Sequence, residues 1–202
     1  MKPYLLGITG GIGSGKSTVS KIFEVLGLKI YQSDDMAKYL MENDNKLISS
    51  IINSFGEESY IDGKINKEYI SKNVFYDKEK LKTINNLVHP VVINDFKKWC
   101  LIHKNEKILI KEAALLFESK SYKELDFIIY VYAETKLRIS RILKRDSHRT
   151  KDQIEHIIKS QLTDKESFEK ADYILENNEK SLLLPEVIEL YEKIRKKAAN
   201  LY

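Results

Sequence analysis

A glycine-rich segment near the start of the chain has the residue types and spacing needed to hold phosphate groups. Residues 10–17 fit the pattern G-x-x-x-x-G-K-[ST]. The glycines allow a tight turn that brings backbone N–H groups against phosphate oxygens, and the helix expected after them directs its positive end at the same anion. Lys16 can reach the β- and γ-phosphates, and the Ser17 hydroxyl can ligate magnesium. The segment therefore predicts binding of a nucleoside triphosphate, with magnesium carried in by the nucleotide.

Arginine is concentrated in one part of the chain, where it could act on phosphate. Four of the five arginines lie in residues 138–149, whereas lysine supplies positive charge elsewhere. The spacing of Arg138, Arg141 and Arg145 places them on one face of a helix. One interpretation is that this face is simply an ordinary solvated surface. A solvated surface leaves the change to arginine unexplained, whereas the rigid arginine fork fits phosphate oxygens and stabilises charge during phosphoryl transfer. We therefore expect a lid that closes over the nucleotide and excludes water. The side chains expected to pack on the other side of this helix are Ile139, Ile142 and Leu143.

Two other side chains could act on an acceptor. Asp34 follows the second predicted strand, where a carboxylate could orient an acceptor hydroxyl and take its proton. Aspartate is also a favoured helix N-cap, so Asp34 could merely cap the next helix, unless Asp35 is the cap. His89 precedes Pro90 at a predicted helix junction, where a lone histidine is more typical of a local structural contact than of catalysis.

The order of apolar runs predicts an α/β fold with a parallel sheet. Helical segments separate five short runs that read as strands, at residues 4–8, 28–31, 108–110, 127–132 and 173–175. A first helix over about 15–26 should stop at Gly27. A long helical insertion over about 35–104, with a turn at Asp62-Gly63 and a break at His89-Pro90, suggests a substrate-covering subdomain. Residues 135–170 are expected to be helical, and the chain after Asn177 to form a loop and an amphipathic helix.

Composition limits the classes of protein that the chain can belong to. No apolar run in the 202 residues approaches the roughly 20 residues needed to span a bilayer. The first predicted strand begins at residue 4, so we expect no secretory leader. The single cysteine, Cys100, excludes an internal disulfide and fits a cytoplasmic location. The net charge of +4 is too small to indicate nucleic-acid binding, and the histidines show no metal-ligand spacing. We expect a monomer or a small homo-oligomer, without a membrane or nucleic-acid partner.

Together with the glycine-rich segment, several short motifs make the chain similar to the dephospho-coenzyme A kinase family over almost its whole length. The matching segments, in order, are GITGGIGSGKST (7–18), SDDMAK (33–38), DGKI (62–65), VFYD (74–77), LVHP (87–90), ALLFE (114–118), KRD (144–146), Gln161, Ala171-Asp172 and ENN (176–178). The phosphate-binding motif alone is shared by many families, and the ordered combination is far more specific.

The resemblance implies ATP-dependent phosphorylation of the ribose 3′-hydroxyl of dephospho-coenzyme A, giving coenzyme A and ADP. It implies a P-loop fold with a five-stranded parallel core, an acceptor subdomain and a helical lid in one domain spanning 1–202. The core is expected at about 1–34, 105–134 and 171–202, the acceptor subdomain at about 35–104 and the lid at about 135–170. In the family, the aspartate matching Asp34 is the proposed general base, and an arginine matching Arg145 belongs to the lid contacts.

These observations give one set of predicted site residues. The predicted catalytic residues are Lys16, Asp34 and Arg145. The predicted ATP-binding residues are Gly11, Gly13, Ser14, Gly15, Lys16, Ser17, Thr18, Arg141 and Arg145, with Ser17 as the ligand of ATP-bound Mg²⁺. The predicted acceptor-binding residues are Asp34, His89, Arg138 and Arg149.

Departures from the family pattern fall mainly on the acceptor side. The family often has Asp-Ala-Asp where this chain has Gln32-Ser33-Asp34, and a proline where it has Ala114. The D-G-x-L-D-R pattern ends here in Asn66-Lys67. Another small-metabolite or nucleoside monophosphate kinase would share the P-loop and lid but not readily the other motifs. A nucleotide-dependent switch is a more distant alternative, because no N-K-x-D guanine-recognition motif is present.

Overall fold

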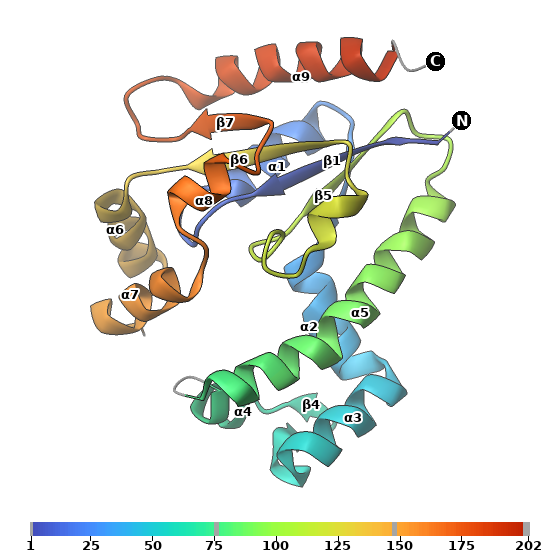
Figure 1. The fold of residues 1–202 in the computed structure, drawn as a ribbon, viewed down its shortest axis with the longest axis vertical. Helices are drawn as coiled ribbons and strands as arrows, with labels where there is room; N and C mark the ends of the chain where they lie inside the picture. Colours follow the sequence, from blue (N-terminus) through green and yellow to red (C-terminus); the bar gives the residue numbers. More distant parts are fainter. Residues whose placement is uncertain (1, 75–76, 147–148, 200–202) are drawn as a thin grey trace. The chain divides into compact units, whose positions relative to one another are not determined.

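A parallel five-stranded sheet forms the centre of the structure, a computed structural model that describes residues 2–74, 77–146 and 149–199 (Figure 1). The strand order is β2-β5-β1-β6-β7, and every neighbouring pair is parallel. The bounds are β1 (Tyr4–Thr9), β2 (Lys29–Gln32), β5 (Ile108–Glu112), β6 (Phe127–Tyr132) and β7 (Tyr173–Glu176). The five predicted strands and the α/β class are thus confirmed. In the motif VFYD, Phe75 and Tyr76 lie outside the described residues.

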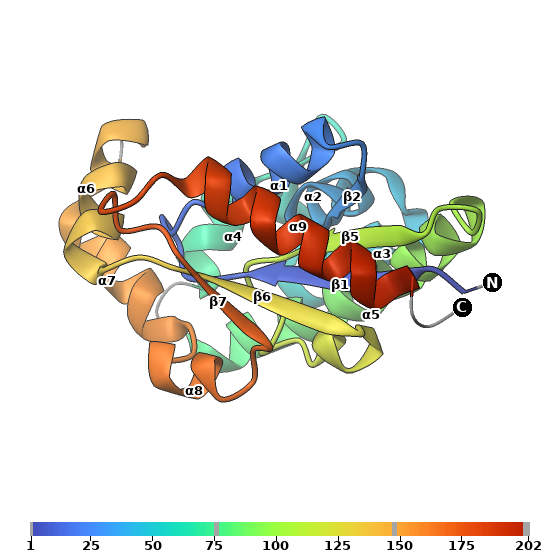
Figure 2. The ribbon, with the colours of Figure 1, turned by 90° about the horizontal axis from the view of Figure 1, so that it is seen from above.

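Alternate residues of β6 enter different cores on the two faces of the sheet. Phe127, Ile129 and Val131 join the larger core, which includes side chains of α1 (Lys16–Val25) and α9 (Leu183–Ala199). Ile128 and Tyr130 join the core on the opposite face. That face is covered by the chain after β5, which contains η2 (Ser121–Glu124), and by α8 (Asp164–Phe168). Figure 2 shows α1 and α9 on their shared face.

The end of α1 sets up the approach to β2. The N–H of Gly27 donates to the Glu24 carbonyl at 2.9 Å and that of Leu28 to the Phe23 carbonyl at 3.1 Å, which is a Schellman arrangement. Gly27 has a positive φ of 92°, as this type of cap requires. The predicted stop at Gly27 is therefore confirmed, and the chain enters β2 two residues later.

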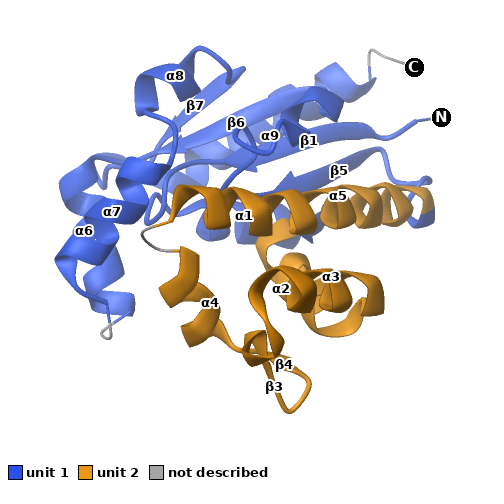
Figure 3. Ribbon diagram, turned by 60° about the horizontal axis from the view of Figure 1, so that its bottom comes forward, with its two compact units in different colours: residues 1–32, 102–202 blue, residues 33–101 orange. Residues whose placement is uncertain are grey.

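The described chain divides into two compact units, coloured separately in Figure 3. One unit contains the sheet, and the other comprises Ser33–Leu101. The elements of the second are α2 (Ser33–Asn43), α3 (Asn45–Phe55), η1 (Glu57–Ser59), β3 (Tyr60–Ile61), β4 (Lys64–Ile65), α4 (Lys67–Val74) and most of α5 (Lys78–Ile102). The predicted turn at Asp62-Gly63 is confirmed, and it joins β3 to β4 in a short antiparallel hairpin that was not predicted.

The predicted helix break at His89-Pro90 is wrong. Helix α5 runs without interruption from Lys78 to Ile102, with Pro90 inside it. Its buried side chains recur every fourth residue on both sides of the proline, at Ile84, Val88, Val92 and Phe96. Burial of this stripe favours one continuous helix. The helix therefore tolerates the loss of the one backbone hydrogen bond that Pro90, which has no N–H, cannot donate.

The described residues between β6 and β7 contain three helices, as the helical pattern of residues 135–170 predicts. They are α6 (Thr135–Arg145), α7 (Lys151–Ser160) and α8. The last two begin with capping boxes, formed by Thr150 with Gln153 and by Thr163 with Glu166. Among all helices in residues 2–74, 77–146 and 149–199, none is both long and apolar enough to cross a membrane.

Candidate active site

The phosphate-binding segment, residues 10–17, follows β1 directly and leads into α1. We call it the P-loop. Gly13 and Gly15 have φ angles of 79° and 96°, in the left-handed region that side chains disfavour. Within the described part of the chain, the amides of Gly13, Gly15 and Ser17 donate to no protein acceptor. The loop thus gathers unpaired N–H donors at the positive end of α1, where an anion can accept them.

The side chains of the P-loop also suit a polyanion. Lys16 is largely buried, and its ammonium donates to the Gly10 carbonyl at 2.8 Å and to the Gly11 carbonyl at 3.4 Å. The Ser14 hydroxyl is buried and has no hydrogen-bond partner among the described residues. Ser17 is exposed in the first turn of α1. A cation, an unpaired hydroxyl and unpaired amides around one loop fit a nucleoside triphosphate.

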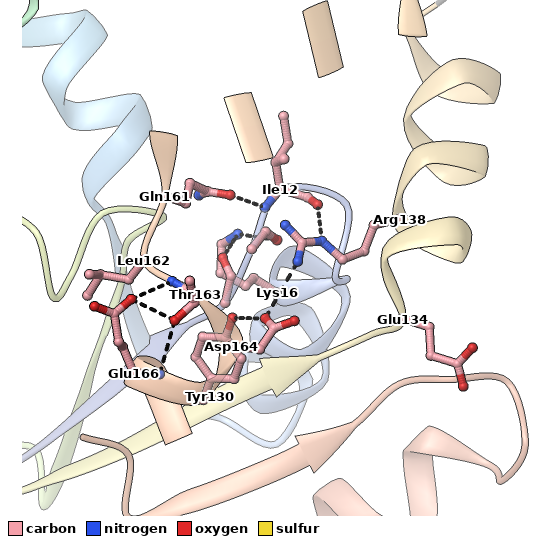
Figure 4. A network of polar contacts seen from close by, with 12 residues as sticks. Ile12, Lys16, Tyr130, Glu134, Arg138, Gln161, Leu162, Thr163, Asp164 and Glu166 are labelled. Atoms are coloured by element: carbon pink, nitrogen blue, oxygen red, sulfur yellow. Dashed lines mark hydrogen bonds and ion pairs between the residues drawn. The ribbon is translucent and has the colours of Figure 1, made fainter. Parts of the chain in front are cut away.

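The α6–α8 segment is fastened to the P-loop at Ile12 (Figure 4). The Ile12 N–H donates to Gln161 Oε1 at 2.9 Å, and the Ile12 carbonyl accepts from Arg138 Nε at 2.9 Å. Arg138 is only 4% exposed. Its Nη1 lies 3.6 Å from Asp164 Oδ1, which also accepts from the Tyr130 hydroxyl at 2.7 Å. Burial raises the pKa of Tyr130, and the hydrogen bond to Asp164 adds to this rise, so the hydroxyl remains a donor.

Arg141 and Asn177 hold the next part of the P-loop. Asn177 Nδ2 donates to the Ser14 carbonyl at 2.8 Å, and Arg141 Nη1 lies 3.4 Å from the same oxygen. Arg141 also donates to the Asn177 carbonyl at 3.0 Å and pairs with Glu179 at 3.0 Å. A Cβ atom on Gly15 would lie 2.2 Å from Asn177 Nδ2, so this close approach requires glycine.

The remaining predicted arginines lie at the end of α6 and beyond it. Arg145 makes a two-pronged contact with Asp146, with both nitrogen–oxygen distances 2.9 Å, which raises the pKa of Arg145. Arg149 Nε lies 3.4 Å from the same carboxylate. Side-chain exposure is 5% for Arg138 and 63% for Arg145, so the arginine face passes from the protein interior to its surface.

The expected packing on the opposite side of α6 is wrong in part. Ile142 is buried, but Leu143 is 40% exposed and Ile139 only half-buried. The reason is that Arg138 and Ile142, one turn apart, share the face that contacts the P-loop at Gly13. The helix therefore buries its first arginine instead of presenting it to solvent.

Asp34 and His89 belong to the second unit. Asp34 lies in the first turn of α2, two residues after β2 ends, and its side chain is exposed. Within the described residues its carboxylate makes no hydrogen bond or ion pair, so it does not form the N-cap bond considered from the sequence. Asp35 pairs with Lys38 at 2.7 Å. His89 is half-buried in α5.

A small pocket opens beside the start of the P-loop. It is lined by Thr9, Gly10, Gly11, Ala114, Phe117, Glu118, Tyr130, Gln161, Leu162 and Ser167. Glu118 accepts a hydrogen bond from the Leu162 N–H at 3.0 Å, which ties the ALLFE segment to the residue after Gln161. In the described residues, no group of three or more His, Cys, Asp or Glu side chains is arranged to hold a metal ion.

Comparison with known proteins decides between the kinases that could use such a site. A sequence model of the family described as dephospho-CoA kinase matches residues 4–182, which include every motif named above. The chain belongs to the dephospho-CoA kinase family. It is accordingly a kinase of coenzyme A biosynthesis, and the resemblance inferred from its motifs is confirmed.

Relatives support the same assignment over nearly the whole chain. The dephospho-CoA kinase of Bacteroides fragilis is 36% identical over 193 residues, with 94% of each chain covered. That of Fusobacterium nucleatum is 39% identical over 179 residues, covering 88% of this chain and 91% of the relative.

Solved structures agree in fold. A Thermus thermophilus protein matches 98% of each chain at 25% identity, with a TM-score of 0.82. The Campylobacter jejuni dephospho-CoA kinase covers 96% of this chain and 98% of its own, at 26% identity and a TM-score of 0.70. An Acinetobacter baumannii shikimate kinase, 16% identical with a TM-score of 0.57 over 96% and 94% of the two chains, shows only that the fold is shared.

Sequence reasoning did not place all the residues that shape the P-loop of this kinase. Gln161, Glu118 and Asn177 each fall in a motif that carried the family resemblance, and that was the signal that could have identified them. Asp164 and Tyr130 fall in no such motif. Their roles follow only from contacts over 34 sequence positions.

Proposed function

We propose that this kinase transfers the γ-phosphoryl group of ATP to the ribose 3′-hydroxyl of dephospho-coenzyme A, giving coenzyme A and ADP. The observation that carries the proposal is the P-loop cradle, with its unpaired amides and Lys16, in a chain matched to this family from residue 4 to residue 182. Such a cradle can hold the phosphates of ATP while an acceptor hydroxyl attacks.

On the ATP side, each P-loop residue has a distinct task. The amides of Gly13, Gly15 and Ser17 donate to phosphate oxygens, and Lys16 moves its ammonium from the Gly10 carbonyl to the β- and γ-phosphates. Ser17 would hold Mg²⁺ through its hydroxyl, and the bound ion would neutralise negative charge on the phosphates. Gly11, Ser14 and Thr18 complete the predicted loop contacts.

On the acceptor side, Asp34 orients the 3′-hydroxyl and accepts its proton. Its carboxylate is exposed and free of partners among the described residues, so its oxygens are available to an acceptor hydroxyl. His89 and Arg149 are the other predicted acceptor contacts. Arg138 was also predicted there, but its buried contacts with Ile12 and Asp164 favour a role on the ATP side.

The helical segment with α6–α8 acts as the lid, and Ser33–Leu101 as the acceptor subdomain. Arg141 and Arg145 would stabilise charge on the phosphoryl group as it moves, because a guanidinium fork matches its oxygens. A cytoplasmic location and a monomer or small homo-oligomer remain predictions for this enzyme.

A coupled assay of ADP release tests the function directly. The purified chain is incubated with ATP and Mg²⁺, with and without dephospho-coenzyme A, and in parallel with shikimate, gluconate and nucleoside monophosphates. We expect ADP release to depend on dephospho-coenzyme A, and coenzyme A to appear in equal amount. ADP release that depends on another acceptor, or on none, would overturn the assignment.

A further inference from the structure

We infer that Arg138 is a positioning residue for ATP, which presets the P-loop by clamping the Ile12 carbonyl, and that it does not contact the acceptor. The inference rests on the proposed function only in that ATP is the P-loop ligand. It concerns the first arginine of α6, one turn before Arg141 and two turns before Arg145.

Both polar groups of Ile12 are held by the α6–α8 segment. Its N–H donates to Gln161 and its carbonyl accepts from Arg138, each at 2.9 Å (Figure 4). These two bonds hold the two successive peptide groups that flank the Ile12 Cα, and neither group can rotate without losing its bond. The amide of Gly13, which belongs to the same peptide unit as the Ile12 carbonyl, is thereby fixed in direction.

The Gly11 backbone lies directly against the guanidinium of Arg138. A Cβ atom on Gly11 would be 2.1 Å from Nη2, 2.3 Å from Cζ and 2.6 Å from Nη1. The φ angle of Gly11 is not in the left-handed region, so the backbone itself does not require glycine there. A side chain at position 11 would therefore displace the Arg138 guanidinium, so the packing of Arg138 favours glycine there.

The guanidinium is also anchored on its far side. Asp164, the first residue of α8, lies 3.6 Å from Nη1, and Tyr130 of β6 donates to the same carboxylate oxygen at 2.7 Å. This carboxylate lies within ion-pair distance of the guanidinium and offsets its buried charge. Arg138 thus joins β6, α6 and α8 to one carbonyl of the P-loop.

A packing role alone would not need arginine. At 4% exposure a charged side chain loses most of its hydration, which is unfavourable unless its hydrogen bonds are specific. An apolar residue of similar volume could fill the space but could not hold the Ile12 carbonyl. The charge-assisted bond to that carbonyl is thus the feature specific to arginine.

Substitutions at position 138 separate positioning from acceptor binding. We expect Arg138→Gln and Arg138→Lys each to weaken binding of the non-hydrolysable analogue AMPPNP about tenfold, measured by calorimetry, since glutamine loses the charge and lysine loses the planar fork that contacts Ile12 and Asp164. The KM for ATP should rise similarly, with kcat and the KM for dephospho-coenzyme A unchanged. A rise confined to the acceptor KM, or wild-type AMPPNP affinity in Arg138→Lys, would overturn the inference.

Two further variants control for loss of stability. Asp126→Asn weakens a 2.7 Å bond to the Leu5 N–H at the amino end of β1, far along the strand from the P-loop. It should lower Tm without changing AMPPNP affinity. Because the Asp164 side chain is partly exposed, we expect Asp164→Asn to stay folded even if the Arg138 variants unfold, and to weaken AMPPNP binding in the same direction. Unchanged affinity in Asp164→Asn would contradict the anchoring of Arg138.

A double-mutant cycle tests the contact with Gly11. Gly11→Ala should weaken AMPPNP binding in the wild-type background because the new methyl displaces the guanidinium. In an Arg138→Ala background the same change should add little, so the two effects should be strongly non-additive. Additive effects would show that Gly11 serves the nucleotide directly and would reject the clamp. Because AMPPNP binding needs no acceptor, these results are independent of whether dephospho-coenzyme A proves to be the substrate.

Discussion

Asn177 donates a 2.8 Å hydrogen bond from its amide to the carbonyl of Ser14, across 163 positions of sequence. Asn177 directly follows β7, one of the two edge strands of the five-stranded sheet, whereas Ser14 lies in the P-loop after the central strand β1. The contact is possible because the five strands of this sheet are parallel and their carboxyl ends lie on the same side of it. The last strand thereby contributes to the shape of the loop formed after the first.

Replacing Asn177 should impair nucleotide binding more than it impairs folding. Asn177→Ala removes the bond to Ser14 and one partner of Arg141, so we expect AMPPNP affinity to fall about threefold to tenfold by calorimetry. Asn43→Ala removes an exposed amide bond to the Tyr39 carbonyl, in the other unit, and should leave affinity unchanged. Equal affinities in the two variants would mean that the Ser14 contact does not shape the loop.

Two glycines with nearly the same backbone angle should respond differently to alanine. Gly15 (φ 96°) and Gly27 (φ 92°) both incur a conformational cost of about 1–2 kcal/mol as alanine. A Cβ on Gly15 would also collide with Asn177, whereas a Cβ on Gly27 meets nothing within 4 Å. Gly15→Ala should therefore lower AMPPNP affinity roughly tenfold or more. Gly27→Ala should lower only the free energy of unfolding, and lost affinity in that variant would contradict this account.

The sheet could be predicted from local pattern because each strand is a short apolar run between helices. Tertiary burial decided the features that were missed. The dipeptide His89-Pro90 indicates a break by backbone chemistry alone, but the buried stripe that includes Val88 and Val92 keeps α5 continuous. Which side chains of α5 are buried depends on the tertiary structure, so the local sequence around Pro90 does not reveal the free energy gained by burying that stripe.

The candidate site divides in the same way. Lys16 and Ser17 were predicted because the phosphate-binding motif is contiguous, and Asp34 because it follows a predicted strand. The partners of the P-loop, Gln161 and Arg138, contact Ile12 across 149 and 126 positions. Helical spacing shows which side chains share a face of α6 but not whether that face is buried, so the inward position of Arg138 could not be read from it.

Asp34→Asn should separate catalysis from ATP binding. The amide keeps the shape of the carboxylate but cannot accept the proton, so we expect kcat to fall by about 100- to 10,000-fold with AMPPNP affinity unchanged. The matched control is Asp35→Asn, which breaks only the exposed pair with Lys38. Near-normal turnover in Asp34→Asn would remove Asp34 from the role of base.

Arg145→Lys should reduce turnover although the charge is kept. The guanidinium fork of Arg145 engages both oxygens of Asp146, and the same fork would serve a phosphoryl group, whereas an ammonium offers no such planar pair of donors. We expect the rate constant of phosphoryl transfer in single-turnover measurements to fall about 100-fold. Arg195→Lys changes an exposed arginine of α9 and should have no effect. Wild-type turnover in Arg145→Lys would show that Arg145 does not contribute to phosphoryl transfer.

Alkaline pH should destabilise the second unit through Tyr60. The Tyr60 hydroxyl donates to the Met41 carbonyl at 2.6 Å, and burial, with the nearby charge of Glu42, raises its pKa from 10.0 to about 12. Because the folded pKa lies above the unfolded value, the stabilisation is fully present below pH 10 and is lost as pH rises from 10 towards 12. Tyr60→Phe should lower Tm at pH 8 and reduce its further decline between pH 10 and 12, as followed by circular dichroism. Parallel Tm curves for the two proteins over that range would show that Tyr60 does not contribute to the alkaline transition.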